Sequence, residues 1–249
     1  MDNVEKPTKV SFWSKLQSVA LTVVAIMLSL GQWNDTKDAV SSAYESFVAN
    51  WTNDIEYKHL STLHVGQTQA YITSIFGNPH VSKISKSDSE IVYFYYGNKK
   101  YQLTLAIKDK RLSGYAVVGL NPDFQVSVPY TTQTLLSTPL EHYFSQTDRY
   151  FSDANNIEYY AESHDLGKKA MFYNLILGAV NYGNFSTSDR SSVKQLNADL
   201  DRGIEDVSTV LATSRKLTPN YFAVTELAPK VMVEGLLTHF EYKTLLKID

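Results

Sequence analysis

The sequence predicts an α+β protein with an N-terminal transmembrane helix, a small domain of a short helix plus an antiparallel meander, and a mostly helical C-terminal domain. Three observations predict this order: a charge-free apolar span near the N-terminus, strand-like alternation between 80 and 120, and helically spaced apolar residues after 140. We divide the 249 residues into a cytoplasmic tail and anchor at 1–34, a stalk helix at 35–58, the small domain at 59–120 and the helical domain at 121–249.

The predicted membrane helix lies between Trp13 and Trp33. No charged residue occurs from Leu16 to Asn34, a span of roughly 28 Å as a helix and close to the ~30 Å hydrocarbon layer. Three lysines precede the span, so the positive-inside rule places the N-terminus in the cytoplasm and the remainder in the periplasm or outside the cell. The expected location is therefore the inner membrane, single-pass. A cleaved signal peptide, cut near 29–31, and a buried core helix are the alternatives.

Small residues recur along one face of this span, at Ser18, Thr22, Ala25 and Ser29. Such a face lets two membrane helices approach closely, so helix–helix association through it is one expectation. The alternative is an ordinary apolar helix that happens to contain small residues.

The stalk helix is predicted from apolar residues at helical spacing between 39 and 51, which give it one apolar face.

The composition of the chain excludes several classes of protein. With 43% apolar and 20% charged residues the chain is typical of a folded protein, and a net charge of -3 gives no reason to expect nucleic acid as a partner. The absence of cysteine excludes disulfides, thiolate metal ligands and an acylated lipoprotein anchor.

The small domain opens with a helix of about nine residues. Thr68 is its expected N-cap, Gly77 its left-handed C-cap, and Pro79 prevents continuation. Strand-like segments follow at 80–86, 90–97, 99–108 and 111–120, with turns at 97–98 and 109–110.

Four consecutive aromatic residues in the second of these strands are the candidate binding residues. Because strand side chains alternate, two of them share one face and two the other. One face is expected to pack on the short helix, and the opposite face to lie under the C-terminal domain or to bind a partner. The residues are Tyr93, Phe94, Tyr95 and Tyr96.

This part of the chain resembles the SmpA/OmlA family, the BamE-like domain. The matching residues are Leu63, Gly66, Thr68, Ile72, Phe76, Gly77, Pro79, Tyr93, Tyr95, Leu105 and Val117. The resemblance implies a small helix-and-meander module of the bacterial envelope that binds proteins and does not catalyse. It covers about 60 of the 249 residues, and the chain lacks the lipoprotein cysteine of that family.

The remainder, 121–249, begins with a proline-rich crossing and then reads as helical. The apolar run at 167–184 is expected to form a buried helix, since it is too short to span a bilayer. Residues 190–216 show the clearest amphipathic helix, and 225–247 a final helix or helix plus strand.

Catalytic and metal-binding patterns are not readable. Ser163, His164 and Asp165 are adjacent in sequence, whereas a triad needs residues that converge in space. Metal spacings, phosphate loops and dinucleotide fingerprints are missing, so we expect no metal, no cofactor and no enzyme activity.

The sequence thus predicts a membrane-anchored protein-binding or scaffold module of the cell envelope, with the membrane and an unidentified envelope protein as partners. The alternatives are an extracytoplasmic hydrolase built on His164 and a cytoplasm-facing membrane effector.

Overall fold

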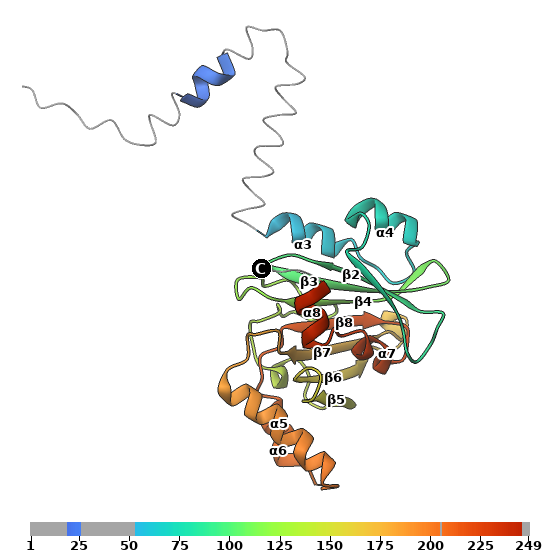
Figure 1. Ribbon diagram of the computed structural model, residues 1–249, viewed down its shortest axis with the longest axis vertical. Coiled ribbons are helices and arrows are strands. Elements are labelled where there is room, and N and C mark those ends of the chain that lie inside the picture. Colours follow the sequence, from blue (N-terminus) through green and yellow to red (C-terminus); the bar gives the residue numbers. More distant parts are fainter. Residues whose placement is uncertain (1–18, 26–52, 205, 246–249) are drawn as a thin grey trace, which may run out of the picture. The chain divides into compact units, whose positions relative to one another are not determined.

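An eight-stranded antiparallel sheet organises the molecule, with the strand order β1-β2-β3-β4-β8-β7-β6-β5 (Figure 1). The computed structural model describes residues 19–25, 53–204 and 206–245, and the chain divides into two units, 1–56 and 57–249. The strands are β1 (Val81–Ile84), β2 (Val92–Gly97), β3 (Tyr101–Lys108), β4 (Arg111–Gly119), β5 (Arg149–Asp153), β6 (Tyr159–Asp165), β7 (Asn174–Val180) and β8 (Tyr221–Thr225). The helices are α3 (Asp54–Ser61), α4 (Gln69–Phe76), α5 (Thr187–Asp201), α6 (Ser208–Ser214), α7 (Pro229–Glu234) and α8 (His239–Leu245), with 3-10 turns η1 (Leu140–His142) and η2 (Lys168–Ala170).

The first four strands lie where the alternation predicts them. The Asn98 side chain accepts backbone N–H bonds from Lys100 and Tyr101 and closes the turn between β2 and β3. Asp109 and Lys110 join β3 to β4 with φ angles of 51° and 59°. Two consecutive positive φ angles are what a tight two-residue hairpin requires.

Helix α4 has the predicted caps. The Thr68 hydroxyl accepts a hydrogen bond from the Tyr71 backbone N–H, and Gly77 follows the last turn with φ 72° and ψ -162°. The positive φ at Gly77 is confirmed, but its ψ takes it outside the left-handed helical region that the sequence predicts.

The predicted helical C-terminal domain is wrong. Residues 149–225 supply four further strands, and β8 pairs with β4, so one sheet runs across the predicted boundary at 120. The apolar run at 167–184 contains η2 and then β7, which lies between β6 and β8, instead of a buried helix. A central strand covered on both faces has no alternation, and periodicity therefore cannot separate it from a buried helix.

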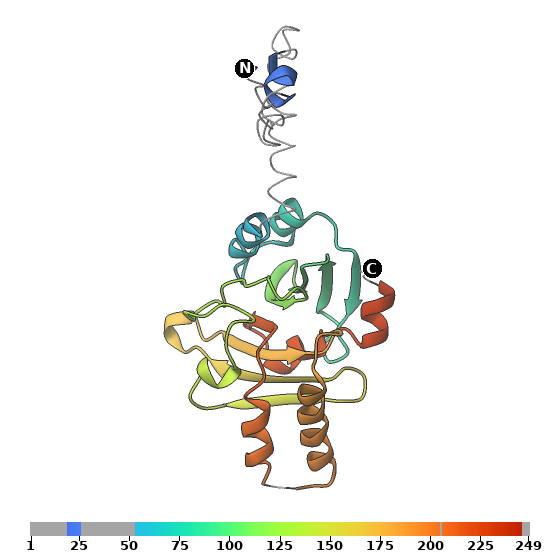
Figure 2. The same cartoon turned by 90° about the vertical axis from the view of Figure 1, so that its left-hand side faces the viewer.

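The amphipathic stretch at 190–216 is a pair of helices rather than one. A capping box at Ser186 and Asp189 starts α5, and Gly203, at φ 72°, follows its end. Figures 1 and 2 show α5 and α6 side by side, projecting from the sheet. Val193 and Leu196 of α5 belong to the main core.

The two faces of the sheet are covered by different helices. One face packs with α3, α4, α5 and the segment 124–140 in a core that contains Ile72, Leu105 and Phe222. The other face packs on α7 and the residues that follow it, through Met232 and Leu237. Both faces are buried, so β3 and β4 carry almost continuous burial in place of alternation.

The predicted membrane helix has only residues 19–25 within the described structure, as a short exposed helical stretch, and the rest of the span lies outside the described residues. In the described ranges no helix is long and apolar enough to cross a membrane. The transmembrane anchor and the single-pass inner-membrane location are corrected accordingly: the structure does not support them.

Several other N-terminal predictions fall on undescribed residues. Of the predicted stalk helix at 35–58, residues 35–52 lie outside the described residues. The described part begins at residue 53, and α3 begins at Asp54. Ser18 and Ser29 of the small-residue face are likewise outside them, so association through that face stays a prediction.

Candidate functional site

A mostly apolar cavity of about 660 Å³ opens beside α3, on the face of the sheet that α3 and α4 cover. Its floor is formed by the strand residues Tyr115, Phe222 and Val224. Leu60 and Leu63 form a wall from α3 and the turn that follows it, and the opposite wall comes from segments 125–130 and 171–173. A volume of this size falls within the ~300–1,000 Å³ typical of small-molecule sites.

The rim of this cavity is built from strained backbone. Tyr130 and Met171 line the cavity and Phe172 adjoins it, with φ angles of 63°, 55° and 58°. Left-handed backbone costs an L-residue roughly 1–2 kcal/mol, and bulky side chains rarely adopt it. The Phe172 N–H donates to the Gly167 carbonyl at 2.9 Å, which helps to hold the 167–173 loop in this shape.

The same three side chains are exposed, at 55% for Tyr130, 67% for Met171 and 60% for Phe172. Large apolar side chains gathered at the mouth of an apolar cavity form a surface that a ligand can cover. Burial raises the pKa of Tyr115 at the floor and of Tyr130 at the rim, and therefore favours their neutral forms.

The basic side chains of the cavity, Lys58 and His64, come from α3 and the turn after it. Lys58 extends from α3, and His64 follows in the turn, where its Nδ1 lies 2.9 Å from the Thr62 carbonyl. The His64 backbone N–H donates to the Gln67 side chain, which in turn donates to Thr62. These bonds fix the position of the imidazole.

The four aromatic residues predicted to bind a partner lie inside the molecule. Tyr93 and Tyr95 share the face toward α7, are fully buried, and donate hydrogen bonds to the carbonyls of Val231 and Gly235. Tyr96 is buried and Phe94 half-buried on the opposite face. Partner binding by these residues stays a prediction, but little of their surface is accessible in the folded chain.

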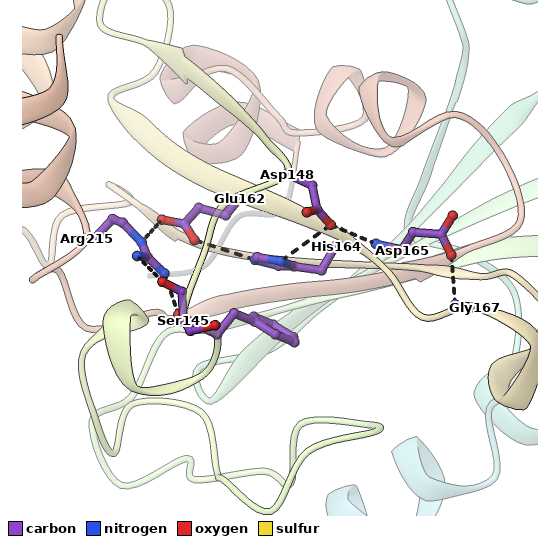
Figure 3. A network of polar contacts seen from close by, with 8 residues as sticks. Ser145, Asp148, Glu162, His164, Asp165, Gly167 and Arg215 are labelled. Atoms are coloured by element: carbon purple, nitrogen blue, oxygen red, sulfur yellow. Dashed lines mark hydrogen bonds and ion pairs between the residues drawn. The ribbon is translucent and has the colours of Figure 1, made fainter.

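A buried ion-pair network lies at the other end of the same face (Figure 3). Glu162 is fully buried on β6, and its Oε1 accepts hydrogen bonds from Arg215 Nε at 2.8 Å and from the Tyr160 hydroxyl at 2.9 Å. Its Oε2 lies 3.5 Å from His164 Nε2, longer than an ideal hydrogen bond. His164 Nδ1 lies 3.8 Å from the exposed Asp148 carboxylate.

Arg215 also forms hydrogen bonds with backbone carbonyls of the loop that follows η1. Its guanidinium also donates to the carbonyls of Phe144 and Ser145, at 2.5 and 3.3 Å, and so ties the end of α6 to the segment after η1. Burial by itself raises the pKa of Glu162, but the contacts with His164, Tyr160, Thr147 and Arg215 outweigh it. The pKa of Glu162 is consequently below its ordinary value.

This network is not arranged as a hydrolase site. The Phe144 ring stacks on the His164 imidazole with 3.7 Å between the two ring centroids, and His164 is only 5% exposed. The alternation of β6 turns Ser163 and Asp165 to the opposite side from His164, and the Asp165 carboxylate accepts the Gly167 N–H. His164 lines neither the large cavity nor a second one of about 300 Å³ beside α7. The contacts support a structural role.

Metal-binding geometry gives no further site. Among the described residues, no group of three or more His, Cys, Asp or Glu side chains is placed to hold a metal ion.

Comparisons with known proteins leave the family open. No family model and no curated protein matches the chain. Among solved structures it is similar to a cysteine-rich secretory protein from Staphylococcus aureus, at 10% identity and a TM-score of 0.33, covering 70% of this chain and 48% of that one. It is also similar to an extracellular SCP-domain protein from Bacillus anthracis, at 11% identity and a TM-score of 0.33, covering 68% and 52%.

The chain spans about half the length of these two proteins, and at these TM-scores the likeness carries no argument. The resemblance to the SmpA/OmlA family is corrected, because no family model matches and the meander is one half of an eight-stranded sheet. The predicted location in the cell envelope, with periplasmic domains, depended on that resemblance and on the membrane anchor. It is therefore corrected together with them.

Sequence reasoning missed the cavity. Tyr130 falls in the proline-rich crossing, and the sequence places Met171 in a buried helix. Positive φ at large apolar or aromatic residues such as Met171 and Tyr130 leaves no local signal in the sequence, and the lining of the cavity comes from segments between residues 57 and 224.

Proposed function

We propose that this chain is a binding protein and that its binding site is the apolar cavity beside α3. The observation that carries the proposal is the strained, exposed rim formed by Tyr130 and Met171. Strained backbone persists where the surrounding structure holds it in place, and such sites cluster at ligand-binding positions.

A ligand in the cavity removes the apolar side chains of the rim from water. Each exposed large side chain that a ligand removes from water contributes up to about 1.5–3 kcal/mol of apolar burial. The floor is already buried and well ordered by strand pairing between β4, β7 and β8, so little of that gain is lost in reorganising the site. An apolar ligand small enough to enter the cavity fits this description.

The protein-binding role that the sequence predicts stays a prediction, and the aromatic strand that suggested it is largely covered. For the alternative of a hydrolase centred on His164, the carboxylates of Glu162 and Asp148 do lie near the imidazole. The Phe144 ring, however, stacks on the imidazole and covers it. The geometry therefore favours ligand binding in the cavity over either.

A neutral fluorescent probe, N-phenyl-1-naphthylamine, tests the proposal with the full chain. We expect saturable fluorescence enhancement, and a binding constant weakened roughly threefold to tenfold by Met171→Asn, since the apolar contact is lost. Asparagine tolerates left-handed backbone, so this variant keeps the loop shape. The matched control is Phe240→Asn, which removes another exposed apolar side chain, on α8.

Absence of saturable binding contradicts the proposal. Equal weakening by Met171→Asn and Phe240→Asn contradicts it as well, because the probe would then report general exposed apolar surface.

A further inference from the structure

The charges at the mouth of the cavity define the chemical class of its ligand. Lys58 and His64 are the cationic or potentially cationic side chains that line it, and no carboxylate lines it within the described part of the chain. An apolar interior with positive charge on one side is complementary to an amphiphile with an anionic head group.

We infer that the cavity binds a single-chain amphiphile whose apolar tail lies over Tyr115 and Phe222 and whose carboxylate contacts Lys58 and His64. This inference rests on the proposed function. Both head-group contacts come from α3 and the turn after it, close in sequence, so a head group at this side of the mouth can contact them together.

The position of His64 supports a directional contact. Its Nδ1 donates to the Thr62 carbonyl, which orients the ring, and Nε2 donates to a carboxylate from the imidazolium form, in which both ring nitrogens carry a proton. Lys58 is an exposed, flexible point charge and can follow the head group of tails of different length. Ser61 and Ser127 add hydroxyl groups to the lining.

The floor of the cavity is better suited to an acyl-type tail than to a peptide. Peptides are commonly held by backbone pairing at a sheet edge. Here the floor is the side-chain surface of β4 and β8, which are central strands with neighbours on both sides. A tail without backbone hydrogen-bonding groups leaves no polar atom unsatisfied against Phe222 and Val224.

The test compares two ligands of equal length with different heads. Decanoate and decan-1-ol are used to displace N-phenyl-1-naphthylamine from the full chain near neutral pH. Decanoate is expected to bind about tenfold more tightly than decanol, a difference of ~1.4 kcal/mol. The double variant Lys58→Gln with His64→Gln is expected to lower the ratio of decanoate affinity to decanol affinity from about ten to about one, and this ratio cancels any general effect of the two substitutions on the cavity.

The matched control is Lys243→Gln on α8, an exposed lysine outside the cavity, which retains the preference for decanoate. Added salt is expected to weaken decanoate binding and to leave decanol binding unchanged.

Equal affinity of decanoate and decanol, or a preference that survives the double variant, overturns the inference. Stronger displacement by a leucine-rich peptide with a free C-terminus than by decanoate overturns it too. These outcomes differ from failure of the proposed function, in which the neutral probe itself does not bind.

Discussion

Replacing Arg215 with methionine tests how far the buried Glu162 carboxylate depends on its ion pair. The Glu162 side chain is 0% exposed and that of Arg215 16% exposed. Removing one member of a buried pair leaves an uncompensated charge, and typical costs are about 3–5 kcal/mol. Tyr160 still donates to Glu162 in the variant, and His164 stays nearby, so we expect the lower end, about 3 kcal/mol.

The assay is urea unfolding followed by circular dichroism, with thermal melting in parallel. A loss of 3 kcal/mol corresponds to roughly 6–12 °C in a chain of this size. Glu162→Gln keeps an acceptor for Arg215 and Tyr160, so we expect a smaller cost of about 1–2 kcal/mol. In the double variant the two costs are expected to be less than additive by about 1–3 kcal/mol.

The matched control is Arg202→Met at the end of α5. Arg202 is 67% exposed and lies 3.5 Å from Asp199, so its loss is expected to cost less than about 1 kcal/mol. If Arg215→Met costs no more than Arg202→Met, or if the double variant is additive, Glu162 does not depend on this pair and the reasoning is refuted.

The pH dependence of the same network has a definite sign. Because the pKa of Glu162 is lowered in the folded chain, its contribution to stability is present above its unfolded pKa, near 4.5, and is lost as pH falls through the folded pKa. The difference in stability between the parent and Glu162→Gln is therefore expected to shrink below about pH 4.5.

Substitutions at two further positions test the structure around α4 and α7. Gly77→Val and Gly77→Asn are both expected to cost about 1–3 kcal/mol in urea unfolding, because φ 72° with ψ -162° is a region that essentially glycine alone adopts; a neutral asparagine variant contradicts this backbone assignment. Tyr95→Phe leaves the buried Gly235 carbonyl without its 2.9 Å hydrogen bond and is expected to cost about 1–3 kcal/mol. Burial raises the pKa of Tyr95, so its contribution to stability is full below the unfolded pKa of 10 and is lost as pH rises toward the folded pKa; tyrosinate absorbance that the parent shows before unfolding and Tyr95→Phe lacks contradicts that assignment.

Local structure around α4 and the first hairpins is determined by the sequence alone. Thr68 and Gly77 delimit α4, and Asp109–Lys110 closes the hairpin between β3 and β4. These features depend on the backbone preferences and short-range hydrogen bonds of neighbouring residues, which a reader of the sequence can evaluate.

The tertiary structure alone decides the state of the apolar run at 174–180. Its residues are compatible with a buried helix or a buried strand, and pairing with β6 and β8 selects the strand because it gives the backbone hydrogen-bond partners on both edges. The Asn220 side chain bonds the N–H and the carbonyl of Val180, where the pairing with β8 has ended. The same pairing extends the predicted meander of three or four strands to a sheet of eight.

Both candidate sites depend on that long-range pairing. Glu162 and Arg215 are 53 residues apart in sequence and meet because α6 and the loop after η1 fold onto β6. The cavity joins Lys58 of α3 to Tyr130, Met171 and Phe222 across the same face. The residue types were visible in the sequence, but their convergence is a property of strand order, which local preferences do not encode.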